Sequence, residues 1–135
     1  MKITVSAIIN APIQKVWNVW TNPDHICNWN AASDEWYTPH ATNDLRVGGT
    51  YNYRMEAKDG SMGFNLIGTY TSIIQFQRIE HIFEDERKIT VLFESEGNST
   101  RITESFDAET LNPVELQQQG WQAILNNFAR YAESL

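Results

Sequence analysis

The N-terminal part of the chain carries a strand pattern followed by two short helix patterns. Apolar and polar positions alternate over residues 2–10, which is typical of a half-buried strand. Pro12 suits the first position of a helix, and the apolar residues after it recur at three- and four-residue steps up to Trp20. The segment Thr21-Asn22-Pro23-Asp24 repeats a helix start, so we predict a second short helix that ends near Trp29.

The middle of the chain has a two-residue period that predicts antiparallel strands. Residues 28–49 show no sustained period, and only Trp36 and Tyr37 suggest a brief strand there. Alternation then begins, and Asp59-Gly60 is typical of a type I′ hairpin turn. We expect strands over residues 51–57, 62–70, 79–83, 89–93 and 102–106.

The C-terminal part returns to a helical period. Asn112 can cap a helix, Pro113 suits its first position, and Glu115 completes a spacing similar to a capping box. Apolar residues from Trp121 to Leu135 then repeat at three- and four-residue steps. The sequence therefore predicts an α+β fold, with an antiparallel sheet of six or seven strands packed on one long helix that begins near Asn112.

Charge and cysteine content narrow the class of protein. The 135 residues include ten Lys and Arg against seventeen Asp and Glu, and the net charge is −7. No basic cluster is present, so we expect neither a nucleic-acid partner nor a membrane surface. No apolar run has the length of a membrane helix. A single cysteine excludes an internal disulfide, and we expect one cytoplasmic domain over residues 1–135.

Several motifs occur together in an order that resembles a known family. They are Ala11 to Trp17, Trp20 to Trp29, Arg46-Val47-Gly48-Gly49, Lys58-Asp59-Gly60-Ser61, Gly68 with Tyr70, and Gly120 to Leu125. With them the sequence resembles, from end to end, START-like (SRPBCC, birch-pollen-allergen type) proteins of the Aha-type subfamily. These are homologues of the C-terminal domain of the activator of the ninety-kilodalton heat-shock protein ATPase. The resemblance implies a helix-grip fold, in which a curved sheet wraps the last helix and leaves a hollow between them.

Aromatic residues are abundant enough to line such a hollow. Five Trp, five Tyr and six Phe either form its wall or fill a thick core, and both alternatives remain open. A hollow of roughly 300–1,000 Å³ is usual for a small-molecule site. Face parity and the resemblance together select as lining residues Trp29, Trp36, Tyr53, Met55, Phe64, Tyr70, Phe93, Phe106, Trp121, Leu125 and Phe128. The expected partner is a small apolar or amphipathic ligand.

Glu104 is the acidic residue whose strand position directs it into the apolar face. It alternates with Ile102 and Phe106, so we add it to the wall of the hollow. A buried carboxylate must be paired, hydrogen-bonded or protonated. No Lys or Arg shares the parity of the neighbouring core positions, so we expect a raised pKa for Glu104. The alternative is that this carboxylate lies in water at the open end of the sheet.

The sequence contains no arrangement of residues that is typical of a metal or cofactor site. His25 and Cys27 stand two apart on a predicted helix and do not face each other, and no other ligand completes a set. His81 and Glu84 point to opposite faces of a strand. Gly120, inside the last helix, indicates either a close approach of a strand or room in the hollow. We therefore expect no metal and no cofactor.

Two other function classes stay open beside small-molecule binding. The subfamily name suggests a chaperone-linked or stress-response interaction domain, with a chaperone or a second copy of the chain as partner. START-like relatives also include enzymes, so a hydrolase or cyclase that uses Glu104 is the other alternative. Acid/base catalysis needs several convergent polar groups, and the sequence offers only this carboxyl and isolated histidines. We therefore assign no catalytic residue and favour a non-enzymatic domain.

Overall fold

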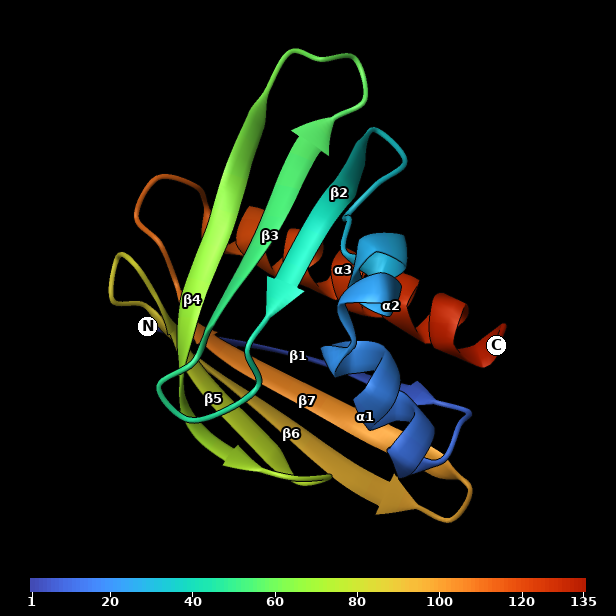
Figure 1. Ribbon diagram of the computed structural model, residues 1–135. Helices are drawn as coiled ribbons and strands as arrows, with labels where there is room; N and C mark the ends of the chain where they lie inside the picture. The colour runs from blue at the N-terminus through green and yellow to red at the C-terminus, as the bar shows by residue number, and fades with distance from the viewer.

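Seven strands and three helices make up the computed structural model, which describes residues 1–135 (Figure 1). The strands are β1 (Lys2–Ile9), β2 (Trp36–Asn43), β3 (Thr50–Ala57), β4 (Gly63–Ile74), β5 (Arg78–Phe83), β6 (Lys88–Glu96) and β7 (Ser99–Asp107). The helices are α1 (Ile13–Thr21), α2 (Pro23–Trp29) and α3 (Val114–Glu133). All neighbouring strands are antiparallel in the order β1-β7-β6-β5-β4-β3-β2. This arrangement confirms the predicted helix-grip fold.

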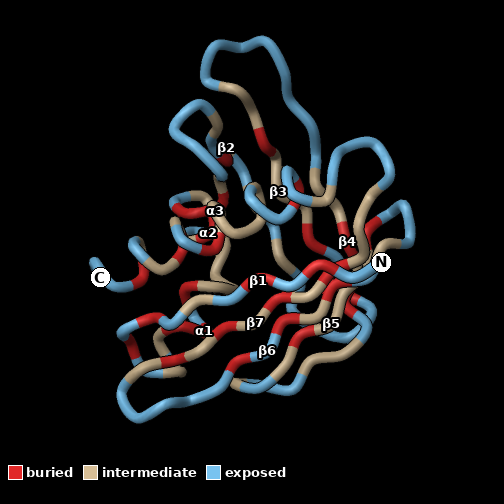
Figure 2. Tube along the Cα trace, turned by 180° about the vertical axis from the view of Figure 1, so that it is seen from behind, coloured by how far each residue is buried: buried red, intermediate tan, exposed pale blue.

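The core lies between the curved sheet and the helices. In Figure 1, α3 runs across the concave side of the sheet, and α1 and α2 lie beside it. Along β7 every second residue is buried, as expected for a strand with one face on the core. Phe128 of α3 is fully buried, so the apolar stripe of this helix faces the sheet as predicted. Figure 2 shows the tip of the β3–β4 hairpin exposed, beyond this core.

Strand β2 is longer than the brief strand predicted around Trp36 and Tyr37. It spans Trp36–Asn43 and pairs with β3 at the edge of the sheet. Its register shifts between Tyr37 and His40, where Pro39 cannot donate a backbone hydrogen bond. Because of this irregularity the side chains do not alternate cleanly, and the strand is defined by its backbone pairing.

The start of α3 also differs from the prediction. The helix begins at Val114, and Pro113 at its N-cap provides no side-chain hydrogen bond. The predicted cap by Asn112 is therefore wrong, and Gln117 instead binds the preceding loop: its Nε2 donates to the carbonyls of Glu109 (3.1 Å) and Asn112 (2.8 Å). Its Oε1 accepts the backbone N–H of Glu109 at 2.9 Å. One nearly buried side chain thus fastens the loop that leads into the helix.

Gly68 and Gly120 have opposite surroundings. A methyl group on Gly68 of β4 would lie 2.3 Å from the hydroxyl oxygen of Tyr51, so this glycine leaves room for the phenol. Nothing lies within 4 Å of the corresponding position on Gly120 of α3. The expectation that Gly120 allows a strand to approach closely is therefore wrong.

None of the three helices combines the length and the apolar character that a bilayer-spanning helix requires.

The two glycines give a matched pair of stability predictions. Gly68→Ala forces the Tyr51 ring to move and lowers the free energy of unfolding by about 1–3 kcal/mol, the usual effect of overpacking. Gly120→Ala relieves a helix-interior glycine and raises that free energy by up to about 1 kcal/mol. Urea denaturation of both variants measures the two changes. Equal effects of the two substitutions would contradict this description of their surroundings.

Candidate functional site

A cavity of about 100 Å³ lies between the concave face of the sheet and α3. It is lined by Trp20, Trp29, Asn30, Tyr51, Tyr53, Met55, Leu66, Tyr70, Ile79, His81, Phe83, Glu104, Trp121 and Ile124. Half of these residues are Trp, Tyr or Phe, and none is Lys or Arg. The cavity is smaller than expected from the sequence, because large rings occupy much of the space between sheet and helix.

Three tyrosines from β3 and β4 form one side of the cavity. The ring centroid of Tyr51 lies 4.8 Å from that of Tyr53 and 5.4 Å from that of Tyr70. The hydroxyl of Tyr51 shares a 2.7 Å hydrogen bond with Nδ1 of His81 on β5. The hydroxyl of Tyr70 donates to Oδ1 of Asn43 at 2.6 Å. The polar ends of two of the phenols are therefore satisfied within the protein.

Burial keeps these phenols and the imidazole uncharged. It raises the pKa of Tyr51 and of Tyr53 well above the ordinary value for tyrosine, and that of Tyr70 to about 12. It also lowers the pKa of His81 to about 4. This side of the cavity is thus neutral at neutral pH.

Glu104 is the acidic group of the cavity. The register of β7 places it between Val5 of β1 and Val91 of β6, so its neighbours across both ladders are apolar. The residue is only 8% exposed, and its carboxyl has no hydrogen-bond or ion-pair partner in the protein. Burial raises the pKa of Glu104 to about 8. At neutral pH the group is mostly a protonated carboxylic acid, which offers one donor and an acceptor to the cavity.

Three tryptophans from the helices form the opposite side. Trp20 and Trp29 stack with their ring centroids 5.0 Å apart, and Nε1 of Trp29 donates to the carbonyl of Val19 at 2.9 Å. Trp121 of α3 stacks on Phe106 of β7, with centroids 3.8 Å apart and an interplanar angle of 12°. These contacts fix the positions of the indoles that face the tyrosines and Glu104.

The structure brings together half of the residues that the sequence suggested. On the cavity wall lie Trp29, Tyr53, Met55, Tyr70, Glu104 and Trp121. Away from the wall lie Trp36, Phe64, Phe93, Phe106, Leu125 and Phe128.

Four of the misplaced residues point inward but lie in the packed core. Phe93 packs edge-on against Trp17, with centroids 5.0 Å apart. Phe106 is covered by its stacking partner from α3, and Leu125 and Phe128 are almost completely buried. The parity of the strands and of the helix correctly predicted that these four side chains point inward. Other aromatic rings lie between them and the cavity.

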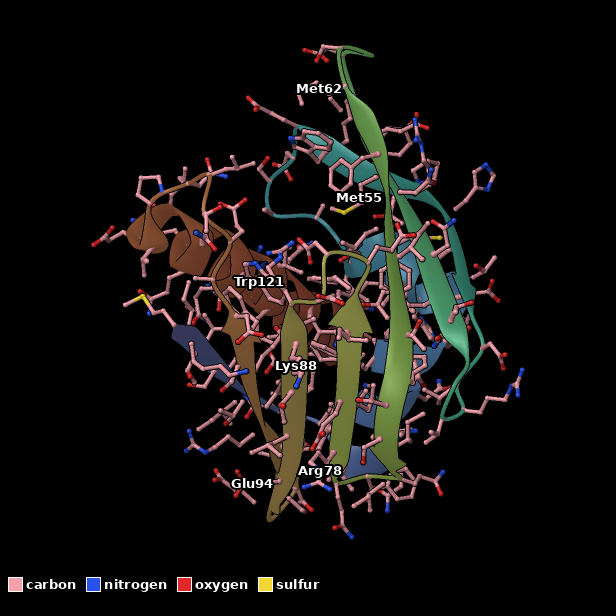
Figure 3. All side chains as sticks on the ribbon, turned by 90° about the vertical axis from the view of Figure 1, so that its left-hand side faces the viewer. Met55, Met62, Arg78, Lys88, Glu94 and Trp121 are labelled. Carbon is pink, nitrogen blue, oxygen red and sulfur yellow. The ribbon has the colours of Figure 1, made fainter.

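Trp36 and Phe64 lie too far toward the end of the β3–β4 hairpin. Their rings contact each other, with centroids 5.9 Å apart, and Phe64 is 44% exposed. In Figure 3, Met62 lies near the tip of the hairpin, while Met55 lies further down, toward Trp121. Phe64 has the parity of the lining residues of β4, but the hairpin carries it beyond the cavity.

Eight lining residues were missing from the prediction. They are Trp20, Asn30, Tyr51, Leu66, Ile79, His81, Phe83 and Ile124. The signal was present for most of them: Tyr51 shares the parity of Tyr53, and the three residues of β5 share one face of that strand. Asn30 had no such signal, because it follows the last residue of α2.

The other polar candidates lie apart from the cavity wall. Nδ1 of His25 is 2.7 Å from the hydroxyl of Tyr131, and Cys27 is half-buried without a disulfide partner. No three His, Cys, Asp or Glu side chains are grouped closely enough to hold a metal ion.

Comparison with known proteins identifies similar chains. The family model described as "Activator of Hsp90 ATPase homolog 1-like protein" matches residues 10–133. The solution structure of an AHSA1-like protein from Aeromonas hydrophila is 46% identical, with a TM-score of 0.93, covering 99% of this chain and 93% of that one. A protein from Cytophaga hutchinsonii is 50% identical, with a TM-score of 0.86, covering 98% and 92%. No curated protein matches.

A structure of much lower sequence identity is similar to this chain in fold alone. A protein from Nitrosomonas europaea is 16% identical, with a TM-score of 0.84, and the match covers 99% of this chain and 95% of that one.

The raised pKa of Glu104 predicts a pH-dependent stability. The folded protein binds this proton more tightly than the unfolded chain, so stability falls as pH rises from the ordinary glutamate pKa through about 8. Glu104→Gln removes this dependence, and its advantage over the parent grows by a few kcal/mol across that range. Urea denaturation at several pH values measures it, with exposed Glu84→Gln as control. A variant that is less stable than the parent at high pH would show an ionised, satisfied carboxylate.

His81 gives the opposite pH dependence. Its lowered pKa means that the unfolded chain takes up this proton first, so stability falls as pH drops from the ordinary histidine pKa through about 4. NMR titration of the ring is expected to show a neutral imidazole down to about that pH. Because burial is the cause, Tyr51→Phe leaves this pKa low. Titration near the ordinary value in the parent protein would contradict the burial of the ring.

Proposed function

This chain belongs to the family of activator of Hsp90 ATPase homolog 1-like proteins, and we propose that it binds a small molecule in the cavity between its sheet and α3. The proposed ligand has an apolar body and one polar group. The body contacts the aromatic wall, and the polar group meets the carboxyl of Glu104.

The carboxyl of Glu104, which belongs to the cavity wall and has no hydrogen-bond partner in the protein, is the observation that supports this function best. A buried polar group without a partner costs free energy, and natural proteins retain few of them. A perturbed carboxyl in an apolar recess is a common feature of functional sites. A ligand that bonds to Glu104 would recover the free energy that its burial costs.

The composition of the wall fits binding better than catalysis. Ligand sites combine a mostly apolar wall with a few placed polar groups, which describes this cavity. General acid/base catalysis needs further polar groups aimed at the same point, but the hydroxyls of Tyr51 and Tyr70 are already bonded to His81 and Asn43. The remaining phenol, Tyr53, has a pKa that burial raises well above the ordinary value, so it offers no base beside Glu104 at neutral pH.

The size of the cavity limits the ligand. A dry cavity of about 150 Å³ is large enough for benzene, so about 100 Å³ admits a compact group. Trp121, Ile124 and Leu66 are only half-buried, and the cavity is not fully enclosed. A longer ligand would place one compact end inside and the remainder outside.

Filling the cavity tests this proposal. Benzyl alcohol and cyclohexanol are titrated into the protein while tryptophan fluorescence is followed, because Trp20, Trp29 and Trp121 line the wall. Ile124→Phe adds a ring to the same space and is expected to weaken binding at least about tenfold. Leu116→Phe, at a position of α3 that is 55% exposed, is the matched control and leaves binding unchanged.

Two outcomes would contradict the proposal. Binding that Ile124→Phe leaves intact would place the probes elsewhere on the protein. The absence of binding to the parent protein by any probe would indicate that the cavity is a packing defect of a filled core.

A further inference from the structure

The lining of the cavity also indicates the charge of the ligand. Its aromatic residues are Trp20, Trp29, Tyr51, Tyr53, Tyr70, Phe83 and Trp121. The face of an aromatic ring carries negative potential and attracts cations, most strongly in desolvated surroundings. Half of the lining residues therefore carry rings of the kind that attract a positive group, and the wall has no Lys or Arg that would repel one.

Glu104 supplies the matching counter-ion within the same wall. The residue is 8% exposed and belongs to the cavity wall, and its carboxyl has no protein partner. From this combination we infer that the cavity binds an organic cation, a compact alkylammonium group held against the rings with Glu104 as its counter-ion. This assignment rests on the proposed binding function and specifies its ligand class.

Size and net charge agree with this class. A trimethylammonium group is smaller than a benzene ring and so suits a cavity of about 100 Å³. The chain carries a net charge of −7, which attracts cations and repels anions over the whole surface. An anionic ligand would place its charge beside a buried acid and electron-rich rings, which disfavours it.

The groups around Glu104 determine how binding responds to pH. The titratable side chains that share the cavity are Tyr51 and Tyr53 of β3, Tyr70 of β4 and His81 of β5. The helices and the neighbouring positions of β1 and β6 contribute none.

Arg87 contacts a ring of this wall and already has an ion-pair partner. The guanidinium of Arg87 lies 5.0 Å from the ring centroid of Phe83, and Nε of Arg87 pairs with Asp85 at 2.7 Å. Glu104 is thus the group that must ionise when a cation binds. The proton it loses goes to solvent, so the affinity for a permanent cation rises with pH up to the pKa of Glu104.

A matched pair of probes tests the charge of the ligand. Choline and 3,3-dimethylbutan-1-ol have the same shape, but a neutral carbon replaces the quaternary nitrogen in the alcohol. Calorimetric titration is expected to show choline binding at least about tenfold more tightly above pH 8, with its affinity falling up to tenfold for each pH unit below that. The affinity of the alcohol stays constant, and proton release accompanies choline binding alone.

Substitution of the counter-ion completes the experiment. Glu104→Gln is expected to lose the preference for choline and its pH dependence while it still binds the alcohol, and exposed Glu84→Gln keeps both. If Glu104→Gln fails to fold, the two probes and the proton release, both measured on the parent protein, still test whether the ligand is a cation. Equal or tighter binding of the alcohol by the parent would overturn the cation assignment and leave the binding function standing. Binding of neither probe, together with failure of the neutral alcohols tested above, would overturn both.

Discussion

The alternation of side chains along β7 is the constraint on which the site depends. Successive side chains of a strand point to opposite faces. The alternation that places Ile102 and Phe106 in the core therefore places Glu104 on the same buried face. Antiparallel pairing on both sides fixes this register, with Val5 and Val91 opposite the carboxyl. A slip by one residue would expose the whole apolar set of the strand, so the side chain at position 104 is held in the buried face.

The helix across the sheet determines how much open space remains beside that acid. Trp121 of α3 stacks on Phe106, while Phe128 contacts Trp20 and Trp29 at centroid distances of 4.9 and 5.0 Å. Packed rings therefore fill the hollow except near the tyrosines and Glu104. The two interpretations of the aromatic content are both partly right: most of the rings form a core, and the remainder surround a small cavity.

The positions of most strands, their parity and the apolar face of α3 were predictable because they depend on local periodicity. Parity, together with the family resemblance, directed Tyr53, Met55, Tyr70 and Glu104 toward the concave face, and the structure places all four on one cavity wall. Parity does not say how far along a strand the cavity extends, and for that reason Phe64 was misplaced. Depth in the core depends on tertiary packing, as does the Tyr51–His81 hydrogen bond between strands that the sequence did not connect.

The protonation state of Glu104 tests the account most directly, because the core, the cavity and the proposed ligand all meet at this carboxyl. Infrared difference spectroscopy between the parent protein and Glu104→Gln detects the carbonyl stretch of a protonated carboxylic acid separately from the carboxylate bands. The account predicts a protonated band at neutral pH that disappears as pH rises through about 8. A carboxylate band already present at pH 5 would show that Glu104 is ionised and satisfied, and would contradict it.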